Sequence, residues 1–413
     1  MMTAPQNTHR IVPQPWMYEP ATVAVLGALA AGGVSARFVG GSVRDALLGH
    51  PIDDIDIATP APPERVTELL QKAGIRVVPT GLDHGTVTAI AGTPPRHFEI
   101  TTLRRDVETY GRRARVAFDA DWAADAARRD FTINAIFLDP DGTIHDPVDG
   151  LADLHARRVR FVGDPATRIS EDVLRILRYY RFEARFGTGS GEPQARAACR
   201  AAANLLSNLS AERISQELVK LLETDDPVPA LQMMQEDGVF EVILSEAHRL
   251  DRLRQMIACE PDADPLRRLA ALIEVDGIGA VALAERLRFS NAWRDRLSGL
   301  AAPWGIDPQG DDRAQRRALY RMGTDRYRDL VLLLAAESEV TRERLGELLA
   351  IARDWRPPAF PLTGRDLTDL GIPQGPRVGH LLDAVHEWWQ AGDFIADRGA
   401  CLYRLKELLH PNL

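Results

Sequence analysis

The chain has 413 residues, which exceeds the roughly 100–200 residues of a typical domain and predicts several folded units. Its 45% hydrophobic and 26% charged residues are ordinary for a globular protein and exclude a largely disordered chain. The net charge of -9 argues against a protein that coats nucleic acid non-specifically, although clustered arginines leave room for a basic groove.

The N-terminal residues lack the basic start and apolar run of a secretory leader, and the longest apolar stretch, near residues 23–36, is too short to span a bilayer. The three cysteines, Cys199, Cys259 and Cys401, lie far apart and without CxxC spacing. We therefore expect a cytoplasmic protein with no membrane segment.

The first 150 residues predict a mixed α/β domain. Residues 22–31 form a helical pattern, and residues 36–39 form a short strand that ends at Gly40 and Gly41. Ser42 is expected to cap a helix that reaches residue 48, and residues 52–58 alternate like a strand. Further strands are expected at 76–78, 86–91, 97–103, 116–118, 135–138 and 143–145.

Beyond residue 165 helical periodicity dominates, most clearly at 171–186, 211–222 and 266–275. Glycine- and proline-rich breaks occur at 187–193, 225–229, 303–310 and 357–364. These breaks predict a head (1–150), a helical neck (151–225), a helical body (226–356) and a helical tail (357–413).

The first chemical signal is a pair of acidic residues on a predicted strand. Residues two apart on a strand point the same way, so Asp54 and Asp56 share a face while Ile55 and Ile57 enter a core. Asp53 is expected to point away. Two neighbouring carboxylates favour a hard cation between them, which predicts Mg²⁺, with Mn²⁺ as a possible substitute.

The second signal is the glycine pair just upstream. Without side chains, Gly40 and Gly41 let backbone N–H groups approach a phosphate at a helix start. Either signal alone is weak, because DxD and Gly-Gly are common on surfaces and in turns. Together, at this spacing, they predict a triphosphate seat beside a two-metal site.

GGSVRDALLG (40–49) followed by DDIDIAT (53–59) resembles the nucleotidyltransferase superfamily, in the branch of class II tRNA nucleotidyltransferases and bacterial poly(A) polymerases. The resemblance implies an α+β fold, with a polymerase beta-like, mixed-sheet head followed by an all-α neck, body and tail. It also implies that Ser42 and Arg44 help to bind the nucleotide. FEITTLRRD (98–106) resembles the third conserved strand, which makes Glu99 a third catalytic carboxylate. An exposed strand glutamate is the alternative for that residue.

RRDFTINA (128–135) resembles the family motif that contacts the incoming nucleotide. By this resemblance Arg129 meets phosphate, while Asp130 and Asn134 can hydrogen-bond the ribose. The alternative is an Arg–Asp pair that only closes a loop. The next motif, HDPVDGLADL (145–154), is interpreted as a structural turn, and no further HD pair indicates a hydrolase domain.

EDVLRILRYYRF (171–182) resembles the family's template helix. On a continuous helix, Asp172, Arg175 and Arg178 would share one face. An aspartate and an arginine together can imitate a Watson–Crick edge for C or A, so the resemblance makes Asp172 and Arg175 a protein template. Arg178 and Arg181 would approach the phosphates. A surface ion pair is the alternative.

Two further motifs extend the resemblance. AERISQEL (211–218) implies that Arg213 and Glu217 brace the neck, and residues 363–385 resemble the tail element that grips tRNA. The sequence departs from the family at Asp53, Ile55 and Leu103, where a basic residue and two aromatic residues are common.

The resemblance implies an enzyme that adds CCA to the acceptor end of tRNA from CTP and ATP, without an obligate protein partner. PTGLDHGTVTAI (79–90) favours CCA addition over poly(A) synthesis, and residues 104–115 resemble the flexible loop needed to switch from C to A. The alternatives are a poly(A) polymerase, a CC- or A-adding enzyme, a small-molecule nucleotidyltransferase and a non-catalytic RNA-binding protein.

Overall fold

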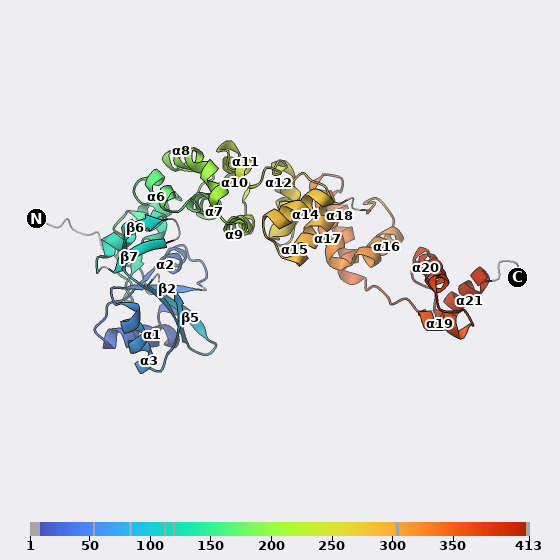
Figure 1. Cartoon of the computed structure of the whole chain (residues 1–413), viewed down its shortest axis with the longest axis horizontal. Helices are drawn as coiled ribbons and strands as arrows, with labels where there is room; N and C mark the ends of the chain where they lie inside the picture. Colours follow the sequence, from blue (N-terminus) through green and yellow to red (C-terminus); the bar gives the residue numbers. More distant parts are fainter. Residues whose placement is uncertain are drawn as a thin grey trace, which may run out of the picture. The chain divides into compact units, whose positions relative to one another are not determined.

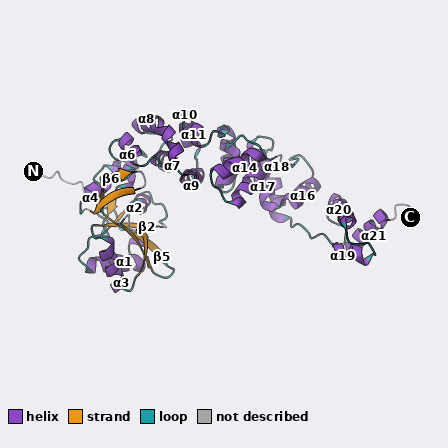
Figure 2. Cartoon of the chain, in the orientation of Figure 1, coloured by secondary structure: helices purple, strands orange, loops and turns teal. Residues whose placement is uncertain are grey.

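The computed structural model describes residues 9–52, 54–81, 85–110, 113–118, 120–302 and 305–409. The chain divides into two compact units, residues 1–245 and 246–413. The first unit joins a sheet domain to helices, whereas the second is helical (Figures 1 and 2). The first unit extends past residue 225, the predicted border between neck and body, because α10 (Val228–Glu236) packs against α7 (Arg175–Phe186). Asp53, which is expected to point away from the pair, lies outside the described residues. Residues 82–84, 111–112 and 303–304 of the predicted segments also lie outside them.

A mixed sheet forms the head, in the order β3-β4-β5-β2-β1-β8-β9. Strands β2 and β5 run parallel, and the other neighbours run antiparallel. The strands are β1 (Arg37–Val39), β2 (Ile55–Thr59), β3 (Arg76–Gly81), β4 (Thr86–Ala91), β5 (Arg96–Thr102), β8 (Phe137–Leu138) and β9 (Ile144–His145). The mixed sheet confirms the α+β prediction.

The two faces of the sheet have different partners. On one face, α1 (Pro20–Ala31) and α3 (Pro63–Lys72) pack together, and Trp16 meets Phe38 with ring centroids 4.6 Å apart. On the other face, Val39, Ala58 and Phe137 form a buried cluster with α4 (Trp122–Ala127). Because side chains alternate along β2, Asp56 lies on the same face as Ala58.

Several boundaries differ from the prediction. The segment expected to be a loop, 104–115, lies largely in an antiparallel hairpin of β6 (Arg104–Tyr110) and β7 (Arg113–Phe118). Val107, Thr109 and Tyr110 in this segment are β-branched or aromatic residues, which favour strands. The strand expected at 135–138 is shorter, because η3 (Thr132–Asn134) turns the chain just before it.

The helix predicted at 171–186 is two helices, α6 (Pro165–Glu171) and α7. The backbone of Asp172 is extended, at φ -151 and ψ 107, which ends α6 before α7 begins. By contrast, α9 (Ala211–Leu222) has the predicted bounds. The remaining elements of this part are α2 (Gly41–Leu47), α5 (Gly150–His155), α8 (Pro193–Ala202), η4 (Ala203–Asn208) and α11 (Phe240–Ile243).

Aromatic rings connect the head to the neck. Phe131 lies 5.0 Å from Phe161 and 4.8 Å from Phe182 between ring centroids, and Phe161 stacks on Tyr179 at 5.6 Å. All four rings are buried. Such packed ring pairs stabilise beyond the area they bury, so this cluster fixes α7 against the nucleotide-binding part of the head.

The second unit is built around α17 (Thr324–Ala336), whose residues 330–334 are all buried. The other helices are α12 (Leu250–Cys259), α13 (Pro265–Leu272), α14 (Gly277–Arg286), α15 (Asn291–Ala301), α16 (Asp312–Met322), α18 (Arg342–Asp354), α19 (Gly364–Asp369), α20 (Pro376–Ala391) and α21 (Arg398–Leu409). The helix expected at 266–275 ends at Leu272, because the chain leaves it to bridge Ile273 with Ala247.

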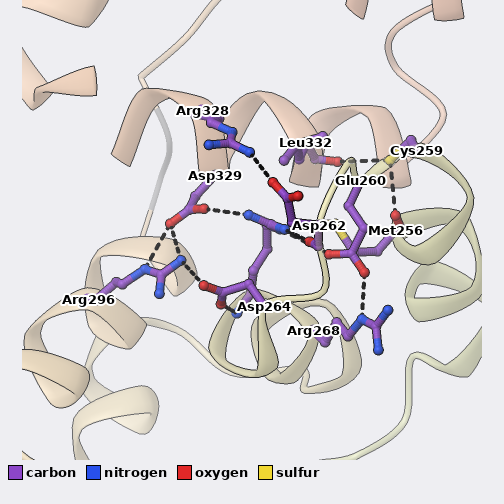
Figure 3. Close-up of polar contacts among 11 residues, drawn as sticks. Met256, Cys259, Glu260, Asp262, Asp264, Arg268, Arg296, Arg328, Asp329 and Leu332 are labelled. Atoms are coloured by element: carbon purple, nitrogen blue, oxygen red, sulfur yellow. Dashed lines mark hydrogen bonds and ion pairs between the residues drawn. The ribbon is translucent and has the colours of Figure 1, made fainter. Parts of the chain in front are cut away.

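A buried ion-pair network joins α13 to α17 (Figure 3). Arg267 donates to Glu260 at 2.8 Å and to Asp329 at 3.1 Å, and Arg296 donates to Asp329 at 2.9 Å. In the tail, Leu367, Trp389 and Cys401 form a core onto which Tyr320 of α16 packs. Among the described residues, no helix is both long and apolar enough to cross a bilayer.

Candidate active site

Strand β2 presents the acidic pair differently from the prediction in one respect. Ile55 and Ile57 are fully buried, as expected. Asp56 is half-buried within the strand, whereas Asp54 is exposed and precedes its first residue. The pair therefore consists of one carboxylate held by the sheet and one at its edge.

Glu99 lies beside Asp56, because β5 pairs with β2 in parallel and places these two residues in register. Burial raises the pKa of Asp56 to about 6, and the charge of Glu99 is the next cause. The charge of Asp54 raises the same pKa further. The charges of Glu99, on the neighbouring strand, and of Asp54, just before β2, thus both act on Asp56.

A divalent cation fits this donor set. Repulsion between carboxylates, which raises the pKa of Asp56, is relieved when a cation lies between them. Within the described parts of the chain, no three Asp, Glu, His or Cys side chains form a ready-made metal cage. Mg²⁺ does not need one, because it commonly binds one or two carboxylates and takes water and substrate phosphate oxygens as its other ligands.

The glycine turn lies against Asp56. Gly40 has φ 72, and a Cβ at this position would lie 3.0 Å from Oδ2 of Asp56. A side chain there would be strained and crowded, so glycine is required. Gly41 starts α2, and its backbone N–H lowers the pKa of Asp56 by hydrogen bonding. The turn therefore connects the carboxylates to a helix N-terminus.

Ser42 does not cap that helix. It lies inside α2, is 3% exposed, and its hydroxyl donates to the carbonyl of Val39 at 3.0 Å. Gly40 is the residue at the cap position. Ser42 thus ties the turn to β1, and the prediction that it caps the helix is wrong.

A polar network joins the head to the neck around Asp130. Arg44 donates to Oδ1 of Asn134 at 2.6 Å, and Asn134 donates to Asp130 at 3.0 Å. Arg178 of α7 donates through Nε to the other oxygen of Asp130 at 2.9 Å.

The charge state of Asp130 follows from these contacts. Burial alone would raise the pKa of Asp130, but the Arg178 guanidinium and the hydrogen bond from Asn134 outweigh it and lower this pKa to about 2. Four of the predicted nucleotide-binding residues, Arg44, Asp130, Asn134 and Arg178, therefore belong to one charged, hydrogen-bonded unit.

Arg129 lies near the carboxylates. Its Nη1 is 3.8 Å from the position of a Cβ on Gly40, and its charge lowers the pKa of Asp56. Its Nη2 donates to Asp125 at 2.8 Å. Asp125 is 1% exposed and also holds Arg128. The guanidinium of Arg129 therefore lies where it can meet an anion beside the glycine turn and Asp56.

Asp172 and Arg175 come close in sequence but do not share a continuous helix. Asp172 accepts from Arg213 at 2.7 Å, whereas Arg175 donates to Glu171 at 2.5 Å. The prediction that a single helix face presents them is wrong, because the chain is extended at Asp172. Each side chain is instead held by its own partner.

Arg213 and Glu217 brace the neck as expected. Arg181 donates to Glu217 at 2.6 Å, and Arg213 contacts Asp172, so the predicted bracing by α9 is confirmed. Arg178 is directed to Asp130.

The motif HDPVDGLADL is structural here, since both carboxylate oxygens of Asp146 accept from backbone N–H groups at the start of α5, each at 2.8 Å.

Sequence reasoning missed Asp125 and Asp45. Asp125 precedes Arg128 and Arg129 by three and four residues, which is the spacing of helical ion pairs. Asp45 lies within the glycine motif and accepts from Arg44 at 2.9 Å and 3.1 Å. The positions of Asp125 and Asp45 beside arginines are visible in the sequence, but sequence spacing does not show which carboxylates are buried.

A mixed sheet whose parallel strands bring carboxylates together beside a glycine turn defines a nucleotidyltransferase head. The Poly A polymerase head domain matches residues 36–160, and the domain described as "Probable RNA and SrmB- binding site of polymerase A" matches residues 192–250. The CCA tRNA nucleotidyltransferase 1 of Danio rerio mitochondria is 35% identical over 90% of this chain and 87% of its own length. The chain belongs to the family of CCA-adding tRNA nucleotidyltransferases.

Two further relatives agree. The CCA-adding enzyme of Levilactobacillus brevis is 33% identical over 87% of this chain and 90% of its own. The crystal structure of the Bacillus stearothermophilus CCA-adding enzyme in complex with CTP superposes with a TM-score of 0.78 at 29% identity, covering 92% of this chain and 94% of that one. The family uses a divalent metal ion for nucleotidyl transfer.

Proposed function

We propose that this enzyme adds C, C and A to the 3' end of tRNA from CTP and ATP, using its own side chains in place of a nucleic-acid template. The observation that carries the proposal is the grouping of Asp54, Asp56 and Glu99 beside the Gly40 turn. The names of the relatives support CCA addition over poly(A) synthesis.

Asp54 and Asp56 are the proposed ligands of Mg²⁺, with Glu99 as the third carboxylate. A bound divalent ion would lower the pKa of the primer hydroxyl and stabilise charge on the departing pyrophosphate. The hardness of carboxylate oxygens favours Mg²⁺, and Mn²⁺ can replace it.

The chain's own groups position the reactants. The N-terminus of α2, which follows Gly40, and the guanidinium of Arg129 are the groups proposed to bind the triphosphate. The terminal 3' oxygen of tRNA loses its proton to solvent and bonds to the α-phosphorus, while the bond from that phosphorus to pyrophosphate breaks. Because the groups are fixed before the nucleotide binds, little reorganisation is needed during transfer.

Asp130 and Asn134 are proposed to hold the ribose, together with Arg44. These residues already share hydrogen bonds, and Arg178 connects them to α7. Arg178 and Arg181 add positive charge near the phosphates. A ribose hydroxyl can join this network through the oxygen and amide groups of Asn134.

Base selection is assigned to Asp172 and Arg175. The carboxylate of Asp172 accepts from the exocyclic amine that C and A share, and the guanidinium of Arg175 donates to ring nitrogen and carbonyl oxygen. Their separate partners, Arg213 and Glu171, each hold one of the two groups in place. A fixed pair of this kind selects by hydrogen-bond pattern.

The head (1–150), neck (151–225), body (226–356) and tail (357–413) remain our proposed functional parts, with the body and tail holding the acceptor arm of tRNA. We also place the enzyme in the cytoplasm. Its three cysteines are unpaired, as a reducing compartment requires.

The direct test is incubation with Mg²⁺ and tRNA transcripts that end at the discriminator base, at C or at CC, with CTP and ATP given separately and together. All three should grow to a fixed CCA end, and Asp56→Ala should abolish growth. Long adenosine tails would indicate a poly(A) polymerase, addition to the CC end alone an A-adding enzyme, and no incorporation a binding protein.

Removal of residues 105–114 tests whether addition is complete. This deletion takes away all of β6 except Arg104, together with the first two residues of β7. The variant should still add both cytidines but fail to add adenosine. Unchanged adenosine addition would contradict the assignment of the hairpin to the switch from C to A.

A further inference from the structure

Asp125 is a buried carboxylate with two arginine partners. Its Oδ1 accepts from Nε of Arg128 at 2.8 Å, and its Oδ2 accepts from Nη2 of Arg129 at 2.8 Å and from Nε at 3.1 Å. Burial alone would raise the pKa of Asp125, but the two guanidinium groups outweigh it and lower this pKa. Asp125 is therefore a fixed negative charge between two cations.

The end of α4 also contacts the neck. The carbonyl of Ala127 accepts from Arg168 at 3.0 Å, and the carbonyl of Arg128 accepts from Nη2 of Arg175 at 3.3 Å. Both arginines belong to the segment that presents the proposed template pair, and both contact Glu171. The residues that Asp125 holds are thus in contact with both functional sites.

We propose that Asp125 is a positioning residue that serves two sites at once: it fixes Arg129 beside the triphosphate and, through the backbone of Arg128, fixes Arg175 at the base. This inference rests on the proposed function, because it takes the roles of Arg129 and Arg175 from there. In this arrangement α4 connects the site of nucleotidyl transfer with the site of base selection.

The physical reason is charge balance in a confined space. Arg128 and Arg129 are adjacent cations, and the charge of Arg129 lowers the pKa of Arg128. A neutral side chain at position 125 would leave them to repel one another and to seek other acceptors. Arg129 would then leave the carboxylates, and the carbonyl of Arg128 would move relative to Arg175.

The test compares Asp125→Asn with Asp237→Asn. Asp237 is a matched control, since it is 1% exposed and also holds two arginines, Arg196 at 2.8 Å and Arg200 at 2.6 Å. Neither arginine is a proposed site residue, and the remaining partner of Asp237 is the hydroxyl of Tyr180, at 2.9 Å. For each variant, kcat and KM are measured for CTP and ATP, together with the preference for CTP over UTP and the urea midpoint of unfolding.

Asp125→Asn should lower kcat/KM for both CTP and ATP by about 100-fold, which is the cost of a displaced positioning group. It should also lower the preference for CTP over UTP by about tenfold, because the two bases differ at the edge that Arg175 reads. Asp237→Asn should lower only the unfolding midpoint. If Asp125→Asn does not fold, Asp125→Asn/Arg128→Gln, which removes one of the two cations, takes its place with the same expectations.

Three results would overturn the inference. In the first, Asp125→Asn matches Asp237→Asn and changes stability alone. In the second, the rate falls but the preference for CTP is unchanged, which removes the link to Arg175. In the third, the wild-type enzyme does not incorporate CTP, which overturns the proposed function as well and is distinguishable from the other two.

Discussion

At the scale of single residues, Glu183 shows how a buried group couples stability to pH. It is 3% exposed on α7, and its Oε2 has no hydrogen-bond partner in the described chain. A Cβ at Gly187 would lie 2.0 Å from the same oxygen, so glycine is needed where α7 ends. Burial raises the pKa of Glu183 to about 7.

The raised pKa predicts a loss of stability as pH rises. The unfolded glutamate ionises near its ordinary pKa of 4.5, whereas the folded one resists ionisation until about 7. The contribution of Glu183 to folding is therefore fully present below pH 4.5 and is lost as pH rises through 7. A pKa change of this size corresponds to ~3 kcal/mol.

Glu183→Gln should remove this dependence. We expect the difference in unfolding free energy between pH 5 and pH 8 to be smaller in the variant by ~3 kcal/mol, measured by urea denaturation at both pH values. Comparing differences within each protein cancels the other titrating groups. Identical pH dependence in the two proteins would show that Glu183 ionises normally.

The candidate site illustrates what sequence can predict at this scale. The alternation of Asp54 to Ile57 was sufficient to predict which side chains are buried, because strand geometry has a strict period of two. It could not show that Asp56 lies beside Glu99, since 42 residues separate them and only the parallel pairing of β2 with β5 brings them together. Nor could it show that Asp125 is buried.

At the scale of elements, local signals predicted α9 well and the neck turn poorly. The apolar spacing of residues 211–222 is regular, and the helix has those bounds. Residues 171–186 have a similar spacing, but the chain is extended at Asp172 and its carboxylate accepts from Leu174 N–H at 3.1 Å and from Arg213. A competing side-chain contact of this kind is invisible to periodicity.

The network between α13 and α17 is the most buried set of ion pairs described in the second unit (Figure 3). Asp329 is central to it, because it accepts from Arg267 and Arg296 while only 3% exposed. Buried pairs contribute little net stability when intact, but loss of one partner leaves an uncompensated charge.

Asp329→Asn should therefore lower the unfolding free energy of the second unit by about 3 kcal/mol. Asp354→Asn is the control, because Asp354 pairs with Arg353 at the surface, with 63% and 75% of the side chains exposed. It should change stability by less than ~0.5 kcal/mol. Urea midpoints measure both, and equal losses would mean that burial does not determine the strength of these pairs.

At the scale of the whole molecule, the division at residue 245 separates nucleotide chemistry from the second helical unit. Every proposed nucleotide contact, from Gly40 to Arg181, lies in residues 1–245. The second unit has its own core around α17 and in the tail. Two cores of this kind can unfold in separate steps, so a ligand that binds one unit should stabilise that unit alone.

CTP should therefore stabilise only one of the two steps of thermal unfolding, that of the first unit. At a CTP concentration 100 times its Kd, with Mg²⁺ present, the transition of the first unit should gain ~2.7 kcal/mol, while that of the second stays in place. Differential scanning calorimetry separates the two, and Asp329→Asn identifies the second transition by shifting it. In Asp56→Ala the CTP effect should shrink, because a proposed metal ligand is lost. A single transition that shifts as a whole with CTP would contradict this prediction, because it would mean that the two units unfold cooperatively and that nucleotide binding in the head also stabilises the helices proposed to hold tRNA.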